Sequence, residues 1–147
     1  MTAALSSETV HATCVAIGDH AVLIEGRSGA GKSDLALRLI DRGARLVSDD
    51  YTLVMRDREG RLHARPPFNL AGRMEIRGIG IVEMDHVADI AVALMVVIVE
   101  TPERLPEARA LRHIAGIGVA EIALASLEPS APIKVEMALA RTIAAAG

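Results

Sequence analysis

The stretch EGRSGAGKSD, from Glu25 to Asp34, decides the fold. It contains a full match to the phosphate-binding pattern G-x-x-x-x-G-K-[ST]. Glycines let the backbone wrap closely around a polyphosphate with its N–H groups turned inward, and a following helix adds the positive end of its dipole. The lysine brings positive charge to the outer phosphates, and the serine hydroxyl can bind Mg²⁺. The predicted nucleotide-binding loop consists of Gly26, Arg27, Ser28, Gly29, Ala30, Gly31, Lys32 and Ser33.

The sequence on both sides of this loop has the context that the pattern requires. An apolar segment, Ala21–Glu25, precedes the loop and reads as a strand, and an earlier strand is expected over Val10–Ile17. Helix formers with periodic leucines follow over Lys32–Arg42, and Gly43 is well placed to end that helix. The order of strand, phosphate loop, helix and strand predicts an α/β fold. We expect a P-loop-containing nucleotide-binding domain over residues 1–147, with a mixed, largely buried sheet flanked by helices.

The rest of the chain alternates short strand patterns with turn signals. Strands are expected over residues 45–48, 51–56, 61–65 and 89–100, with a hairpin between the second and third. Residues 74–84 are expected to be a loop that runs into a strand. A helix is expected over Leu105–Ile114, and Val119–Ala125 fits either a strand or a helix. Val135–Ala146, which is rich in alanine, predicts a closing helix.

Composition excludes several classes of function. The formal net charge is -3, and Tyr51 and Phe68 are the only residues among Phe, Trp and Tyr, which argues against a nucleic-acid surface. The longest apolar run, Ile90–Val99, is roughly half of the ~20 residues that a membrane helix needs, so no membrane partner is expected. Cys14 is the single cysteine, and the N-terminus lacks the pattern of a signal peptide. A cytoplasmic protein is therefore expected.

An acidic pair lies one helix beyond the loop. Asp49 and Asp50 follow the strand expected over residues 45–48, at the edge where an open sheet delivers side chains to its binding crevice. Because successive residues of a strand point opposite ways, one aspartate can face metal or phosphate while the other faces an acceptor. A kinase needs both functions.

A third charged segment reads EIRGIGIV over residues 75–82. Glu75 can bind Mg²⁺ directly or through water, and Arg77 can neutralise charge on a transferring group. Taken alone, the same residues also fit an ordinary ion pair at a strand edge. The segment gains weight only beside the phosphate loop and the acidic pair.

In this order and spacing, GRSGAGKSD, RLVSDD and MEIRGIGIVEM resemble the bacterial HPr kinase/phosphorylase family, in particular its C-terminal catalytic domain. The resemblance extends from about Thr9 to Glu83. It implies a serine kinase that uses ATP and Mg²⁺ to phosphorylate HPr, a small phosphocarrier protein of the sugar phosphotransferase system that regulates carbon metabolism. Many members also run phosphorolysis, in which inorganic phosphate attacks the phosphoserine and pyrophosphate leaves.

The resemblance also implies residue roles. Residues 26–33 would bind ATP, with Ser33 and Glu75 on Mg²⁺. Asp50 would accept the proton of the serine hydroxyl, and Asp49 would support it. An arginine that the family carries after the apolar strand has its nearest counterpart in Arg104. The implied catalytic residues are His11, Lys32, Asp49, Asp50, Arg77 and Arg104.

Departures from the family pattern leave alternatives open. The chain resembles the short single-domain forms of the family. Full-length relatives are hexamers, so a homo-oligomer is one open alternative. A sensor-protein partner is another. The family carries a late basic, glycine-containing loop that is associated with dephosphorylation. The corresponding segment here, LEPSAPIKVEM, has Lys134 but no matching arginines or glycine, which favours kinase over phosphorylase activity. Two other functions fit the loop: a P-loop kinase of a small metabolite, and a nucleotide-binding regulatory module without turnover.

Overall fold

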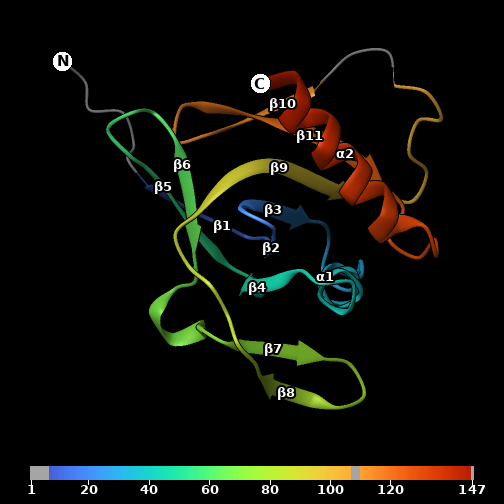
Figure 1. Ribbon diagram of the computed structural model, residues 1–147. Helices are drawn as coiled ribbons and strands as arrows, with labels where there is room; N and C mark the ends of the chain where they lie inside the picture. The colour runs from blue at the N-terminus through green and yellow to red at the C-terminus, as the bar shows by residue number, and fades with distance from the viewer. Residues whose placement is uncertain (1–6, 107–109, 147) are drawn as a thin grey trace.

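The computed structural model describes residues 7–106 and 110–146. Within these ranges the chain forms a mixed sheet of nine strands, a separate two-stranded hairpin, two α-helices and a 3-10 turn at Phe68–Leu70 (Figure 1). The elements are β1 (Ser7–Val10), β2 (Thr13–Ile17), β3 (His20–Glu25), α1 (Lys32–Asp41), β4 (Arg45–Ser48), β5 (Thr52–Arg56), β6 (Leu62–Arg65), β7 (Arg73–Ile76), β8 (Gly80–Glu83), β9 (Ile90–Ile98), β10 (Ala110–Ile114), β11 (Ile117–Leu124) and α2 (Ala131–Ala146). The expected α/β class and the mixed sheet are confirmed.

Strands β3 and β9 form the centre of the sheet. They pair in parallel, and β11 pairs in parallel with the second half of β9, whereas the other strand pairs of this sheet are antiparallel. The side chains of Val22, Leu23 and Ile24 are fully buried, so both faces of β3 are covered. Such two-sided burial is typical of parallel strands, and it explains why β3 and β9 read as continuous apolar runs.

The two faces of the sheet are covered differently. Both helices share one apolar cluster, in which Leu35 and Leu39 of α1 and Val135 and Leu139 of α2 pack with Val22 and its neighbours. The other cluster comes from strands and turns alone, because the sheet folds over on itself through β1, β5, β6 and β10. Figure 1 shows α1 and α2 on the same side of β3 and β9.

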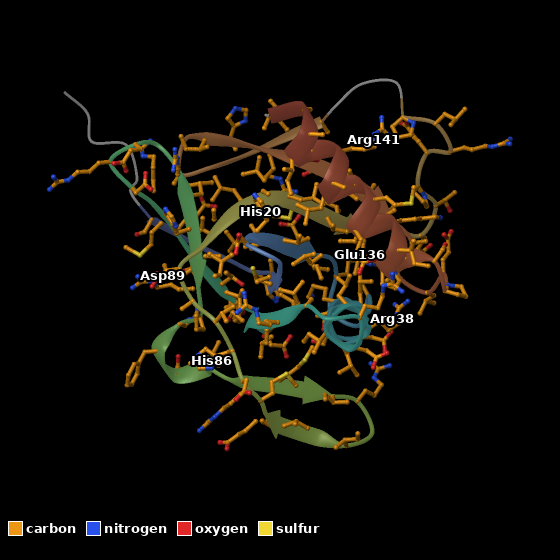
Figure 2. All side chains as sticks on the ribbon, in the orientation of Figure 1. His20, Arg38, His86, Asp89, Glu136 and Arg141 are labelled. Atoms are coloured by element: carbon orange, nitrogen blue, oxygen red, sulfur yellow. The ribbon has the colours of Figure 1, made fainter. Side chains whose placement is uncertain are left out.

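Helices α1 and α2 are also joined by an ion pair at their surface. The Arg42 guanidinium, just after α1, donates to both carboxylate oxygens of Glu136 at 3.0 and 2.7 Å. Figure 2 shows Glu136 on α2 beside the part of α1 that carries Arg38. No helix in residues 7–106 and 110–146 is long and apolar enough to cross a membrane.

The prediction of a helix over Leu105–Ile114 is wrong. Residues 110–114 form strand β10, which pairs with β11, while Leu105 and Pro106 lie outside any helix and residues 107–109 lie outside the described ranges. The cause is the two-residue turn Ala115–Gly116, in which both residues have positive φ, 47° and 83°. Two successive residues of this kind define the tight turn that connects antiparallel strands, and Ala-Gly is a weak sequence signal for it.

Four smaller expectations are refined by the structure. The strand expected over Val10–Ile17 is broken at His11 and Ala12 into β1 and β2. The segment expected as a loop running into a strand, residues 74–84, is part of the hairpin β7–β8. The ambiguous segment 119–125 belongs to strand β11, and the closing helix begins at Ala131, with Pro132 in its first turn where a missing N–H is tolerated.

Candidate active site

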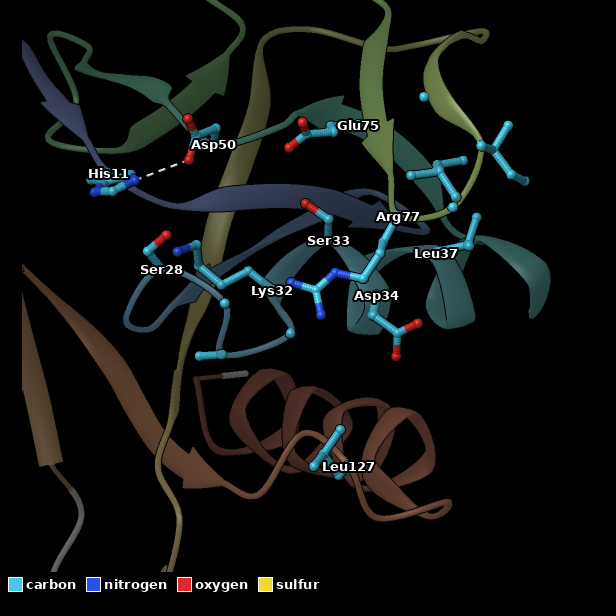
Figure 3. Close-up of a pocket in the computed structure, with 17 residues that line it drawn as sticks. His11, Ser28, Lys32, Ser33, Asp34, Leu37, Asp50, Glu75, Arg77 and Leu127 are labelled. Carbon is cyan, nitrogen blue, oxygen red and sulfur yellow. Dashed lines mark hydrogen bonds and ion pairs between the residues drawn. The ribbon is translucent and has the colours of Figure 1, made fainter.

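A cleft of about 870 Å³ opens where the phosphate loop, helix α1 and the hairpin β7–β8 meet (Figure 3). Its walls bring together most of the residues that the sequence predicts for the site. It is lined by residues 28–34, Leu37, His11, Asp50, residues 75–80 and Leu127. The loop reaches this position because it follows the carboxyl end of the central strand β3.

The phosphate loop has a backbone that only glycine fits well at one key position. Gly31 caps α1 with φ 99°, and an added Cβ would lie 2.8 Å from the Ser126 hydroxyl oxygen. That hydroxyl donates to the carbonyl oxygen of Ala30 at 2.6 Å, so the segment before α2 braces the loop. Lys32 is buried, and its Nζ donates to the Gly26 carbonyl oxygen at 2.8 Å. The lysine is therefore held inside the curve of the loop.

Asp49 joins four elements through its carboxylate. Oδ1 accepts from the hydroxyls of Ser33 at 2.7 Å and Thr13 at 3.0 Å, and Oδ2 accepts from the backbone N–H of Glu75 at 3.0 Å. These donors come from α1, β2 and β7, while Asp49 follows β4. The buried carboxylate thus faces the phosphate loop. Thr13 was missed by sequence reasoning, although a hydroxyl inside an apolar strand was a signal that could have found it.

Asp50 points to the other side and enters the cleft. Its φ of 71° is left-handed, a conformation that Asp and Asn adopt more easily than most residues. Oδ1 lies 2.9 Å from Nε2 of His11, and the His11 ring stacks on Tyr51 at 4.7 Å between centroids. Figure 3 shows this pair beside the phosphate loop. The expected division of the two aspartates agrees with this geometry, and Tyr51 is a second residue that sequence reasoning missed.

Glu75 and Arg77 reach the cleft from the hairpin. Glu75 lies on β7, and Arg77 lies in the turn before β8 and points into the cleft (Figure 3). The hairpin is held against α1 by Met74, which is buried in the same apolar cluster as Leu35 and Leu39. Both charged side chains are exposed, as groups that meet a ligand should be.

Four of the predicted residues do not line this cleft. Gly26 and Asp49 contact lining residues, through the Lys32 ammonium and the Ser33 hydroxyl respectively. The other two lie away from the cleft. Arg27 is exposed and pairs with Glu100 at 3.1 Å. Arg104 lines a second cleft, between the segment after β9, strand β11 and helix α2, together with Glu103 and Arg141. Among the described residues, Arg104 does not line the cleft of the phosphate loop, so its catalytic role stays a prediction.

The polar groups beside the loop fit a Mg²⁺ ion that is bound partly by the protein and partly by the phosphates of a nucleotide. Within the described ranges, no group of three or more His, Cys, Asp or Glu side chains forms a self-sufficient metal cage. Ser33, Asp49 and Glu75 instead supply one hydroxyl and two carboxylates next to the loop. Mg²⁺ is usually bound in this way, by one or two carboxylates together with waters and substrate phosphates.

An ion-pair network lies directly behind the loop. Arg112 on β10 donates to the two carboxylate oxygens of Glu25 at 2.7 and 2.8 Å, and it also pairs with Glu121 on β11 at 3.0 Å. Glu25 is the last residue of β3, immediately before Gly26. The hydrogen bonds from Arg112 hold the pKa of the Glu25 carboxyl below its ordinary value, with smaller contributions from the charges of His11 and Lys32. The network therefore holds the end of the strand that leads into the loop.

We expect Thr13→Val to lower the free energy of unfolding by about 1–3 kcal/mol, because it leaves the Asp50 N–H without its partner and removes one of the two hydroxyls that donate to Asp49 Oδ1. Urea unfolding followed by circular dichroism measures this loss. Thr142→Val is the matched control, since the Thr142 hydroxyl only donates to the Ala138 carbonyl in helix α2. Equal losses in the two variants would show that the Thr13 hydroxyl adds no more stability than an ordinary helix threonine.

The Glu25 network predicts a pH-dependent stability. Because the folded pKa of Glu25 is lowered, its contribution is complete above the unfolded pKa of ~4.3 and is lost as the pH falls through the lower folded value. Glu25→Gln should therefore be less stable than the wild type near neutral pH, and the difference should shrink under acid. Urea titrations at several pH values test this, with the exposed Glu59→Gln as control. A difference that stays constant on acidification would contradict the assignment.

Comparisons with known proteins agree with the geometry. The family model "HPr Serine kinase C-terminal domain" matches residues 3–125, which extends the resemblance well beyond Glu83. The HPr kinase/phosphorylase of Peptoclostridium acidaminophilum is 44% identical over 80 residues, covering 54% of this chain and 26% of the relative. That of Streptococcus thermophilus (strain ATCC BAA-491 / LMD-9) is 46% identical over 76 residues, covering 52% and 25%.

A solved structure is also similar. The structure of the Hpr(Ser) kinase/phosphatase from Coxiella burnetii matches with a TM-score of 0.77 and 31% identity, covering 91% of this chain and 88% of the other. The present chain spans about a quarter of the length of the curated relatives that it matches. The match of the family model over most of the sequence shows that this chain belongs to the HPr Serine kinase C-terminal domain family.

Proposed function

We propose that this domain is a protein serine kinase that transfers the terminal phosphoryl group of ATP to a serine hydroxyl of HPr or an HPr-like carrier. One observation carries the proposal: a single cleft contains the phosphate loop, the Asp50–His11 pair and the Glu75–Arg77 segment. A loop alone would serve any nucleotide-binding protein. A carboxylate exposed beside it adds the group that an incoming hydroxyl requires.

The residues divide the work between holding ATP and preparing the acceptor. Backbone N–H groups of the loop and the N-terminus of α1 bind the phosphates, and Lys32 places positive charge beside them. Mg²⁺ would be held by Ser33 and Glu75, with Asp49 behind Ser33, and it would neutralise charge on the phosphate oxygens. Arg77 adds a second positive charge from the hairpin wall of the cleft.

Asp50 lies where the accepting serine hydroxyl would enter the site. The serine oxygen attacks the terminal phosphorus, its proton passes to the Asp50 carboxylate, and ADP leaves with the electrons of the broken P–O bond. His11 holds the Asp50 carboxylate at 2.9 Å and is itself held by Tyr51. Little covalent chemistry is required of the protein, so positioning and charge neutralisation should supply most of the rate enhancement.

The names of the relatives support HPr as the substrate. ATP as the donor rests on the phosphate loop. The same names include phosphorylase, and phosphorolysis would use the same cleft with Asp50 acting as the acid. The segment before α2 supplies no arginine to this cleft within the described residues, so we propose kinase activity as the main reaction. We place the reaction in the cytoplasm, because Cys14 is a free thiol and thiols stay reduced in that compartment. Cys14 is also buried, and this burial raises the pKa of its thiol.

We expect Lys32→Ala and Asp50→Asn each to lower the rate of phosphate transfer to HPr by at least about a hundredfold while leaving the fold intact. Asn accepts the left-handed backbone at position 50, so this variant removes the charge without adding strain. Transfer from labelled ATP with Mg²⁺ and purified HPr measures the rate, and circular dichroism monitors folding.

Matched controls are available for both variants. Lys134→Ala removes the other lysine of the chain, and Asp89→Asn changes an exposed aspartate that also has positive φ and pairs with an arginine. Both controls should keep the wild-type rate. Wild-type transfer in Lys32→Ala or Asp50→Asn would refute the assigned roles. Label in a small molecule instead of HPr would favour a metabolite kinase, and ATP binding without any transfer would favour a regulatory module.

A further inference from the structure

We infer that Leu127, on the segment between β11 and α2, forms a binding site for the base and ribose of the nucleotide. This inference deepens the proposed function, since it needs a nucleotide in the phosphate loop. The direction in which the phosphate chain of the nucleotide lies follows from the loop itself. Lys32 serves the outer phosphates, on the side of Asp50, and the N-terminus of α1 serves the inner ones. The nucleoside must therefore leave the loop past the first turn of α1.

Apolar side chains line the cleft on that side. Leu37 lies one turn along α1 from Asp34, and Figure 3 shows Asp34 between Leu37 and Leu127. Leu127 is 86% exposed although it lines the cleft. Leaving a leucine in water is costly, and covering it with the flat face of a base would recover part of that free energy. Ile79, at the hairpin tip, is a further exposed apolar residue of the same cleft.

The backbone around Leu127 is fixed to the phosphate loop and to α1. Ser126 donates its hydroxyl to the Ala30 carbonyl at 2.6 Å. Arg38 of α1, itself bonded to Asp34 at 3.0 Å, donates to the carbonyl oxygens of Ser126 and of Glu128, the latter at 3.2 Å. Leu127 is thus held between two anchored neighbours. A residue whose neighbours already hold its backbone beside the loop can bind a ligand without first paying to order that backbone.

The test compares two ligands that share the phosphate chain and differ in the nucleoside. Isothermal titration of the full chain with Mg²⁺-ATP and with Mg²⁺-tripolyphosphate measures the contribution of the base and ribose. We expect Leu127→Ala to weaken ATP binding about fivefold to tenfold and to leave tripolyphosphate binding unchanged, because part of one apolar contact is lost. Leu127→Met, which keeps the apolar volume, should bind ATP within about twofold of the wild type.

Leu111→Ala is the control, because Leu111 is also exposed but lines the second cleft, and it should change neither affinity. In the transfer assay, Leu127→Ala should raise the KM for ATP and leave kcat unaltered. Unchanged ATP binding, or equal weakening of both ligands, would overturn the inference, since the latter would mean that Leu127 acts through the loop. A wild-type chain that binds neither ligand would refute the proposed function itself, and this inference with it.

Discussion

The buried Asp49 carboxylate is the interaction on which the site depends. Three donors reach it, from Ser33 at the start of α1, from Thr13 on β2 and from the Glu75 backbone on β7. A buried carboxylate is costly unless it is hydrogen-bonded, so these donors must come together for the fold to be stable. The same contacts set the phosphate loop, the sheet and the hairpin at fixed positions around one cleft.

This arrangement explains why two adjacent aspartates can take different parts. Asp49 is buried and satisfied by protein groups, whereas Asp50 adopts a left-handed backbone and presents its carboxylate to the cleft beside His11. The difference arises in the turn after β4. A hydroxyl that enters the cleft would therefore meet the carboxylate of Asp50. The side chain of Asp50 is exposed, but its backbone N–H donates to the Thr13 hydroxyl and so fixes its position. The fold places an exposed carboxylate next to a fixed phosphate loop, as the proposed role of Asp50 as the base requires.

Local patterns were sufficient for the core of the fold and for most of the cleft. The loop pattern and the apolar run before it predicted β3, the loop and α1, because both depend on residues close in sequence. The strand β10 could not be predicted in this way, since its cause is the Ala115–Gly116 turn and its pairing with β11. The hydrogen bonds of Thr13 and Ser126 and the position of Leu127 in the cleft were also missed, because they arise only when distant segments meet.

The most direct test is the mass of HPr after incubation with the wild-type domain, ATP and Mg²⁺. If the cleft positions a serine hydroxyl beside the terminal phosphate, HPr should gain the mass of one phosphate group, and fragmentation should place that group on a single serine. An unchanged mass of HPr, under conditions in which the domain binds ATP, would contradict the claim that this cleft is a protein serine kinase site.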